Sequence, residues 1–260
     1  MNSIRKICKE KLTKPAQDIA KSNQMWNKRA GEMHLLSIKG HYDGYMEFFK
    51  QHAELKGASV IDLGCGAGRY LKLLLDEGAL AEGLEPSTEM IKYAKKYLAE
   101  SSYNPDSVAV YNTSFQDFKP EKEYDYVFIS NSPITGYYES YEKILKLAKK
   151  GIFIGEWIER KDLFFERLVR DMGKEVKRQL AFDIYYYFNL FAADGYLPNF
   201  KSSIQVLKEE IIPESCIQRY TSWIYGEAYT EEDRELVLKE ILKYKQADKK
   251  LMGEFHGIRG

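Results

Sequence analysis

Three glycines fall within five positions of the chain, at Gly64, Gly66 and Gly68, directly after a short apolar run. Glycine adopts backbone angles closed to other residues, and it has no side chain to keep a ligand away from the backbone. If the run is a strand and a helix begins near Gly68, the first N–H groups of that helix face the space beside the bend. This bend therefore predicts a binding site for the anionic or polar atoms of a ligand.

A carboxylate follows the bend at the spacing expected of a nucleoside site. Glu85 lies 21 residues after Gly64, at the end of the next apolar run. A carboxylate at the tip of a neighbouring strand can accept both hydroxyl hydrogens of a ribose, and about 20 residues separate the two features in dinucleotide-binding folds. The dinucleotide fingerprint itself does not fit, because Arg69 occupies its third glycine position and would keep the helix from packing closely on the strand.

The pattern that fits is Asp62-x-Gly64-x-Gly66-x-Gly68, and with it the sequence resembles the class I S-adenosylmethionine-dependent methyltransferases. Residues 60–70 (VIDLGCGAGRY) are similar to their first motif, residues 83–97 (GLEPSTEMIKYAKKY) to the acidic second motif, and residues 124–130 (YDYVFIS) to the strand of the fourth. The resemblance covers roughly residues 55–157. It implies an α/β fold with a doubly wound, mostly parallel seven-stranded sheet. It also implies S-adenosylmethionine as the methyl donor, with S-adenosylhomocysteine as product.

The resemblance further implies roles for the residues of a donor site. Asp62 would hold the methionine ammonium, and Glu85 the ribose hydroxyls. The remaining implied contacts are Gly64, Cys65, Gly66 and Ala67 beside the methionine and ribose, Pro86, Ser87 and Met90 beside the adenine, and Ser114, Phe115 and Gln116 in the loop after the third strand. Ser114 stands where many relatives have an acid, so Asp117 is either a substitute for that acid or a helix cap. Cys65 is interpreted as a packing residue between glycines rather than a reactive thiol.

The elements that must position these residues alternate between strands and helices. Short apolar runs predict strands at 58–63, 80–86, 107–112, 124–130 and 151–157, and helical patterns occupy 69–78, 88–100, 136–150 and 160–173. Such alternation is typical of a parallel sheet with helices on both faces. Late strands are expected at 202–209 and 215–223, and a helix at 230–251 after a Thr-x-x-Asp cap. A last strand starting at 253 would end abruptly, which leaves open whether the C-terminus is truncated.

Two segments lie outside this alternation. Residues 1–55 are interpreted as an N-terminal helical cap, and residues 56–260 as the methyltransferase domain with an aromatic-rich insertion at about 175–200. Relatives often fold such a cap over the donor, so Trp26 and Arg29, three positions apart on an expected helix, are candidate contacts with the donor or the acceptor. His34 or His41 is a candidate base for an acceptor that arrives protonated, but no catalytic residue is identified.

The acceptor site is less well specified, because methyl transfer from a sulfonium mainly requires placement of the nucleophile behind the methyl carbon. Asn131 is a candidate donor contact at the tip of the fourth strand, and the candidate acceptor contacts are Ser132, Tyr137, Glu156, Trp157 and Tyr186. Residues 130–138 (SNSPITGYY) also faintly resemble the Asn-Pro-Pro-Tyr motif of adenine amino-methylases. Ser132 and Ile134 replace its first proline and its aromatic residue, so stacking on a base would be lost.

The composition favours a small-molecule acceptor. Lys and Arg together number 39, as do Asp and Glu, so the formal net charge is zero and shows no basic excess for nucleic acid. Three distant cysteines indicate neither a disulfide framework nor a metal site. The absence of a signal peptide and of a long apolar stretch predicts a cytoplasmic protein without a membrane partner. A nucleic-acid methyltransferase and a non-catalytic S-adenosylmethionine-binding module remain alternatives, and the oligomeric state is not predicted.

Overall fold

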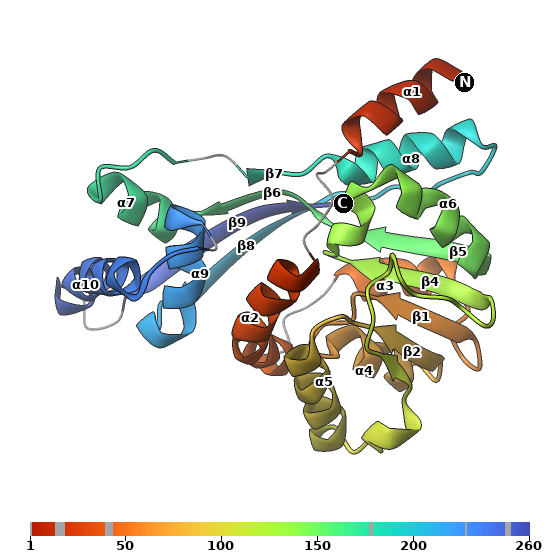
Figure 1. The fold of residues 1–260 in the computed structure, drawn as a ribbon, viewed down its shortest axis with the longest axis horizontal. Helices are drawn as coiled ribbons and strands as arrows, with labels where there is room; N and C mark the ends of the chain where they lie inside the picture. Colours follow the sequence, from red (N-terminus) through yellow and green to blue (C-terminus); the bar gives the residue numbers. More distant parts are fainter. Residues whose placement is uncertain (1, 14–18, 40–43, 177–178, 227, 248–250) are drawn as a thin grey trace. The chain divides into compact units, whose positions relative to one another are not determined.

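A computed structural model describes residues 2–13, 19–39, 44–176, 179–226, 228–247 and 251–260. The chain divides into two compact units (Figure 1): unit 1 comprises Met1–Glu156 and Phe182–Lys201, and unit 2 comprises Trp157–Ala181 and Ser202–Gly260. The expected boundary between a cap and a domain at residue 56 falls inside unit 1 and stays a prediction. The second unit was not expected from the sequence.

Unit 1 is built on a parallel sheet whose strands follow the order β3-β2-β1-β4-β5. The strands are β1 (Ser59–Leu63), β2 (Leu80–Leu84), β3 (Val110–Tyr111), β4 (Tyr124–Ser130) and β5 (Ala148–Gly155). The strand order reverses between β1 and β4, and ligands bind at this point in doubly wound folds. The expectation of seven strands was wrong, because the described residues form five strands in this sheet and the later strands belong to unit 2.

Helices cover both faces of the sheet in unit 1 (Figure 1). Those that connect the strands are α4 (Arg69–Asp76), α5 (Thr88–Glu100) and α6 (Tyr138–Leu147), with short 3-10 helices η1 (Pro105–Ser107) and η2 (Pro133–Gly136). The N-terminal residues form α1 (Asn2–Lys11), α2 (Ile19–Lys39) and α3 (Gly44–His52), and α8 (Asp183–Ala193) packs against α1. The predicted N-terminal helices are therefore present.

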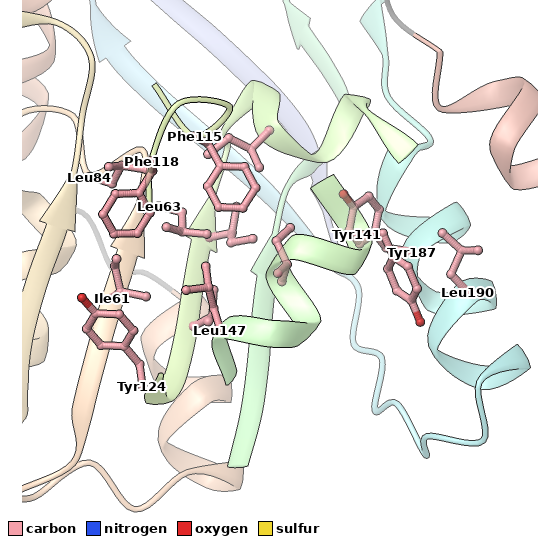
Figure 2. Packing of buried hydrophobic residues seen from close by; sticks show 14 of the residues in the cluster. Ile61, Leu63, Leu84, Phe115, Phe118, Tyr124, Tyr141, Leu147, Tyr187 and Leu190 are labelled. Atoms are coloured by element: carbon pink, nitrogen blue, oxygen red, sulfur yellow. The ribbon is translucent and has the colours of Figure 1, made fainter. Parts of the chain in front are cut away.

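The core of unit 1 is divided by the sheet, since successive side chains of a strand point to opposite faces. Val60 of β1 belongs to the apolar cluster that includes residues of α3 and α4, whereas Ile61 belongs to the cluster that includes residues of α6 and α8. Figure 2 shows the second of these clusters, in which Tyr187 and Leu190 of α8 are fully buried. The aromatic segment was expected to be an insertion over the sheet. Its part from residue 182 is instead a core element of unit 1, and residues 175–181 belong to unit 2.

Unit 2 contains an antiparallel sheet of strand order β7-β6-β9-β8 with three helices that share one apolar cluster. Its elements are β6 (Trp157–Asp162), α7 (Leu163–Asp171), β7 (Gln179–Leu180), β8 (Ser203–Glu210), α9 (Pro213–Tyr225), α10 (Glu231–Ala247) and β9 (Met252–Arg259). The strand expected at 215–223 is wrong, because this stretch lies in α9. Pro213 suits the first turn of a helix, and Cys216, Ile217 and Tyr220 bury one face of it.

No helix in the described ranges is long and apolar enough to cross a membrane.

Candidate functional site

The glycine bend connects β1 to α4 and is tied to the tip of β2. The backbone N–H groups of Gly64 and Cys65 both donate to the Leu84 carbonyl, at 2.8 and 3.1 Å. All three glycines have positive φ, with 87° at Gly64, 52° at Gly66 and 84° at Gly68. These hydrogen bonds keep the bend next to Glu85, the residue that follows β2.

Two of the glycines differ in what surrounds the position of a side chain. A Cβ at Gly68 would lie 3.0 Å from the Cα of Ala94, so the absence of a side chain lets α4 begin against α5. A Cβ at Gly66 would meet no described atom within 4 Å, so this side of the bend faces open space. The backbone of Gly66 is therefore accessible to a ligand from that side.

The Glu85 carboxylate is buried next to the bend and is held in place by backbone N–H groups. Its Oε2 accepts the Gly66 N–H at 3.1 Å, and its Oε1 accepts the Ser87 N–H at 2.8 Å. Each carboxylate oxygen has two acceptor positions, so one on each oxygen is left for a further donor. Burial raises the pKa of Glu85 to about 7, while the two N–H donors act in the opposite direction. Such an oriented carboxylate suits a pair of adjacent hydroxyl groups.

Asp62 supplies a second buried carboxylate, near the end of β1. It is 1% exposed, and its Oδ2 has no hydrogen-bond partner among the described residues. Burial raises the pKa of Asp62 to about 8, and the nearby Glu85 charge adds to the rise. A buried polar atom without a partner is costly, so Asp62 fits a ligand that brings a cation or a hydrogen-bond donor. A methionine ammonium has this chemistry.

Other predicted donor residues surround the bend in structural roles. The Cys65 side chain packs against Gly83 of β2, and burial raises the pKa of its thiol, in agreement with a packing role. Ala67 and Met90 form a small apolar cluster with Ala30 of α2. Pro86 accepts from the Asn112 side chain through its carbonyl at 2.9 Å.

Helix α2 reaches the tip of β2 through a residue that sequence reasoning missed. The Asn27 side-chain oxygen accepts from the Ser87 hydroxyl at 2.6 Å, while that hydroxyl accepts the Met90 N–H as the cap of α5. Trp26 packs against the cluster of Ala67, and the Arg29 guanidinium lies 5.2 Å from the Trp26 ring centre. Contact of Trp26 and Arg29 with a donor stays a prediction. No spacing signal distinguishes Asn27 from its polar neighbours.

The residues of the loop after β3 form a hydrogen-bonded turn and also contribute to the core. The Ser114 hydroxyl donates to the Asp117 carboxylate at 2.7 Å and accepts the Asp117 N–H, so the two residues close a local turn, and no helix begins there for Asp117 to cap. Phe115 is buried in the cluster of Figure 2, and Gln116 is exposed. The structure thus uses Phe115 as a core residue. Asn112 was missed, although its side chain also donates to the Glu85 carbonyl at 3.1 Å and so fixes the tip of β2.

The tips of β4 and β5 carry the candidate acceptor residues. Asn131 has φ of 50°, a strained value for a residue other than glycine, and its N–H donates to the Gly155 carbonyl at 2.8 Å. Ser132 is buried, and its hydroxyl finds no hydrogen-bond partner in the described part of the chain. A Cβ at Gly64 would lie 2.6 Å from that hydroxyl oxygen. The strand tip and the glycine bend are therefore in direct contact.

The remaining candidates are dispersed. The Tyr137 carbonyl accepts from the Tyr187 hydroxyl at 3.2 Å, and Tyr186 packs at the edge of the core cluster. Trp157 belongs to unit 2, where Arg259 lies 4.1 Å from its ring centre.

Of the two histidines considered as candidate bases, only His34 lies in the described part of the chain. His34 is buried beside Tyr93 of α5, with 4.9 Å between the ring centres, and burial lowers its pKa. This position gives His34 a packing role between α2 and α5. His41 lies outside the described residues.

Comparison with known proteins agrees with this geometry. Residues 60–151 match a family model described as a methyltransferase domain. A ubiquinone biosynthesis O-methyltransferase of Coxiella burnetii is 32% identical over 102 residues, which cover 39% of this chain and 41% of that enzyme. An uncharacterized methyltransferase of Geobacillus is 26% identical over 165 residues, covering 54% of this chain and 75% of the relative. The chain thus spans about two-fifths of the Coxiella enzyme.

Solved structures share the fold along most of the chain. The cyclase SpnF has a TM-score of 0.51 at 15% identity, covering 94% of this chain and 97% of its own. YjhP from E. coli has a TM-score of 0.50 at 16% identity, covering 90% of this chain and 98% of its own. At such identities the likeness concerns the fold alone, and an activity must be argued from the site.

Proposed function

We propose that this chain, which carries a class I S-adenosylmethionine-dependent methyltransferase domain, transfers a methyl group from S-adenosylmethionine to a small-molecule acceptor. The observation that carries the proposal is the Glu85 carboxylate, which the N–H groups of Gly66 and Ser87 hold beside the glycine bend. This carboxylate is already oriented to accept from two ribose hydroxyl groups, so the ligand can bind without a rearrangement of Glu85.

The protein groups act mainly by placing the donor. Glu85 accepts the two ribose hydroxyl hydrogens, and Asp62 receives the methionine ammonium in a setting where a cation lowers the cost of burying the carboxylate. When bound, S-adenosylmethionine supplies a methyl group on a good leaving group, so orientation accounts for most of the catalysis. The tips of β4 and β5 are left to hold the acceptor.

A small-molecule acceptor is supported by two features. The formal net charge of zero gives no overall attraction to phosphate backbones. The Coxiella relative is named a ubiquinone biosynthesis O-methyltransferase, and ubiquinone is itself a small molecule. A cytoplasmic location agrees with such an acceptor and is part of the proposal.

The proposal can be tested with methyl-labelled S-adenosylmethionine incubated with fractionated cell extract. We expect label in a small molecule other than S-adenosylmethionine itself, and only when the protein is present. Label in RNA or DNA would instead support a nucleic-acid methyltransferase. A protein that binds S-adenosylhomocysteine but labels no fraction would be a binding module without catalytic activity.

The Glu85→Ala variant should weaken S-adenosylhomocysteine binding by about 1–3 kcal/mol, because the ribose loses a charged acceptor. The variant also leaves the Gly66 and Ser87 N–H groups without this acceptor, so thermal unfolding should accompany the titration. Glu121→Ala is the matched control, since Glu121 is an exposed glutamate after β3. Calorimetry that gives the same affinity for Glu85→Ala and Glu121→Ala would refute the ribose assignment.

A further inference from the structure

The chain that follows β3 runs beside the residue to which the ribose is assigned. Leu84 of β2 pairs with Tyr111 of β3, and the Glu85 N–H donates to the Tyr111 carbonyl at 3.0 Å. The Asn112 side chain then donates to the carbonyls of Glu85 and Pro86, at 3.1 and 2.9 Å. Four hydrogen-bonding groups thus keep the start of this loop against the tip of β2.

The Ser114–Asp117 turn of this loop is anchored in the core at the carboxyl ends of two strands. The Phe115 side chain is 3% exposed, and it belongs to the same apolar cluster as Leu63 and Leu84, which end β1 and β2 (Figure 2). The glycine bend and Glu85 follow these same two strands. The turn therefore lies next to the proposed donor site.

Lys143 of α6 reaches the Ser114–Asp117 turn from a different element and makes three contacts with it. Its ammonium donates to the Phe115 carbonyl and, at 3.2 Å, to the Gln116 carbonyl. It also lies 4.8 Å from the centre of the Phe115 ring. Partial burial lowers the pKa of Lys143, and the nearby Asp117 charge acts in the opposite direction. A cation partly removed from water needs such partners, so Lys143 and the turn hold each other in place.

The contacts of Lys143 also set the direction of a backbone donor. The N–H and the carbonyl of a trans peptide point in opposite directions, and the described residues contain no cis peptide bond. The Phe115 carbonyl and the Gln116 N–H belong to one peptide group, so Lys143 fixes this N–H on the side away from its own ammonium. The Gln116 N–H has no hydrogen-bond partner in the described part of the chain, and it is left to donate to a ligand.

We propose that Lys143 is a positioning residue that, through the Ser114–Asp117 turn, gives the donor site its preference for adenine. The inference rests on the proposed methyl-transfer function. N1 of adenine carries no hydrogen and accepts a hydrogen bond, whereas N1 of hypoxanthine carries a hydrogen. An N–H donor held in one direction therefore suits adenine, and it would face a second donor in hypoxanthine.

Two ligands that differ only in the base test this inference. They are S-adenosylhomocysteine and the analogue in which hypoxanthine replaces adenine. Calorimetry on the parent protein should show at least about tenfold tighter binding of S-adenosylhomocysteine. Lys143→Met keeps an apolar stem and removes the ammonium. It should weaken S-adenosylhomocysteine binding about tenfold and binding of the analogue by no more than about twofold, so the preference should fall at least about fivefold.

Two further substitutions of the same residue support the reading of that result. Lys143→Arg should retain most of the preference, because a guanidinium also carries several N–H donors for the two carbonyls. Lys143→Gln, whose amide is uncharged and one bond shorter, is the second variant if Lys143→Met does not fold. It should reduce the preference in the same direction.

Lys122→Met is the matched control. Lys122 makes the same kinds of contact, since it donates to the Glu82 carboxylate and lies 5.1 Å from the centre of the Tyr124 ring. It precedes β4, so it lies at the amino end of the sheet, opposite to the proposed donor site. Its replacement should leave both affinities unchanged.

The outcomes separate the two proposals. Parent protein that does not bind S-adenosylhomocysteine would overturn the proposed function and this inference together. Parent protein that binds both ligands equally well would overturn the inference alone. Equal weakening of the two ligands in Lys143→Met would reduce Lys143 to a residue that only supports the fold, and it would also overturn the inference. An undiminished preference in Lys143→Met or Lys143→Gln would do the same.

Discussion

The Gly66→Ala variant should remain folded, and its affinity for S-adenosylhomocysteine should fall by about 100-fold or more. Gly66 has φ of 52°, which lies in the left-handed region, and a Cβ there would meet no described atom within 4 Å. The substitution therefore costs only about 1–2 kcal/mol of backbone strain in the protein itself. The new methyl group would project into the space assigned to the donor, so the main loss appears on binding.

Gly57→Ala provides the control for backbone strain. Gly57 precedes β1 and has φ of 74°, and a Cβ at this position would likewise meet no described atom within 4 Å. Both variants should lower the unfolding free energy by similar amounts in chemical denaturation. Calorimetry should show weakened binding for Gly66→Ala only. Parent-like affinity in Gly66→Ala would contradict the assignment of the bend to the donor site.

The Asp62→Asn variant should change stability and binding in opposite directions. A raised carboxyl pKa means that the folded protein binds the proton more tightly than the unfolded chain, so stability falls as pH rises from about 4 to about 8. An amide does not titrate and costs less to bury. The variant should therefore be more stable than the parent at about pH 8, by about 1–3 kcal/mol in denaturant titrations.

Binding by the same variant should depend less strongly on pH. In the parent, the carboxylate must release its proton to hold the ligand ammonium, so affinity for S-adenosylhomocysteine should rise by up to about tenfold per unit between about pH 6 and pH 8. Glu85, whose pKa is also raised, contributes in the same direction. Asp62→Asn should bind at least about tenfold more weakly at pH 8 and show a smaller slope.

Asp125→Asn is the contrasting control for stability. Asp125 accepts hydrogen bonds from the Ser59 N–H and hydroxyl, and these lower the pKa of Asp125 to about 2 together with Lys150. A lowered pKa stabilises the folded protein above the unfolded value, so this variant should be less stable than the parent at neutral pH. An Asp62→Asn protein that is also less stable at pH 8 would argue against a destabilising buried carboxylate.

The sequence predicted the central sheet of unit 1 because its signals are local. Residues 58–63, 80–86 and 124–130 are short apolar runs, and glycines and caps separate them from helices. The Glu85 position was predicted from its spacing after the glycine bend, and in the structure its carboxylate accepts the Gly66 N–H, while its ribose role stays a prediction. The cap of α10 was also predictable from the Thr-x-x-Asp pattern, and Thr230 and Asp233 form reciprocal hydrogen bonds.

Unit 2 was not predictable because its pattern depends on partners distant in the sequence. Strand β6 pairs with β9, and Lys161 of β6 lies opposite His256 of β9. Residues 157–162 contain more charged than apolar positions, so the segment resembled the start of a helix. Residues 215–223 include an isoleucine, a threonine and two aromatic residues, which favour strands, and burial of Tyr220 in the apolar cluster of unit 2 outweighs this preference.

The acceptor side was partly predictable. Ser132 and Glu156 were located at the strand tips from the strand pattern. Both are buried, and the Thr135 hydroxyl, which contacts the Ser132 carbonyl and the Glu156 carboxylate, links them only in three dimensions. Asn27 and Asn112 carried no signal of spacing, because their partners are a side-chain hydroxyl and backbone carbonyls at the tip of β2. Such contacts depend on how helices and loops dock, which a single sequence does not encode locally.

The structure of the protein bound to S-adenosylhomocysteine tests the central claim most directly. We predict that the two ribose hydroxyl oxygens lie within about 2.6–3.2 Å of the two Glu85 carboxylate oxygens, and that the ligand lies against Gly66. Adenosine bound away from the tip of β2, or a Glu85 carboxylate that contacts only the Gly66 and Ser87 N–H groups, would contradict it.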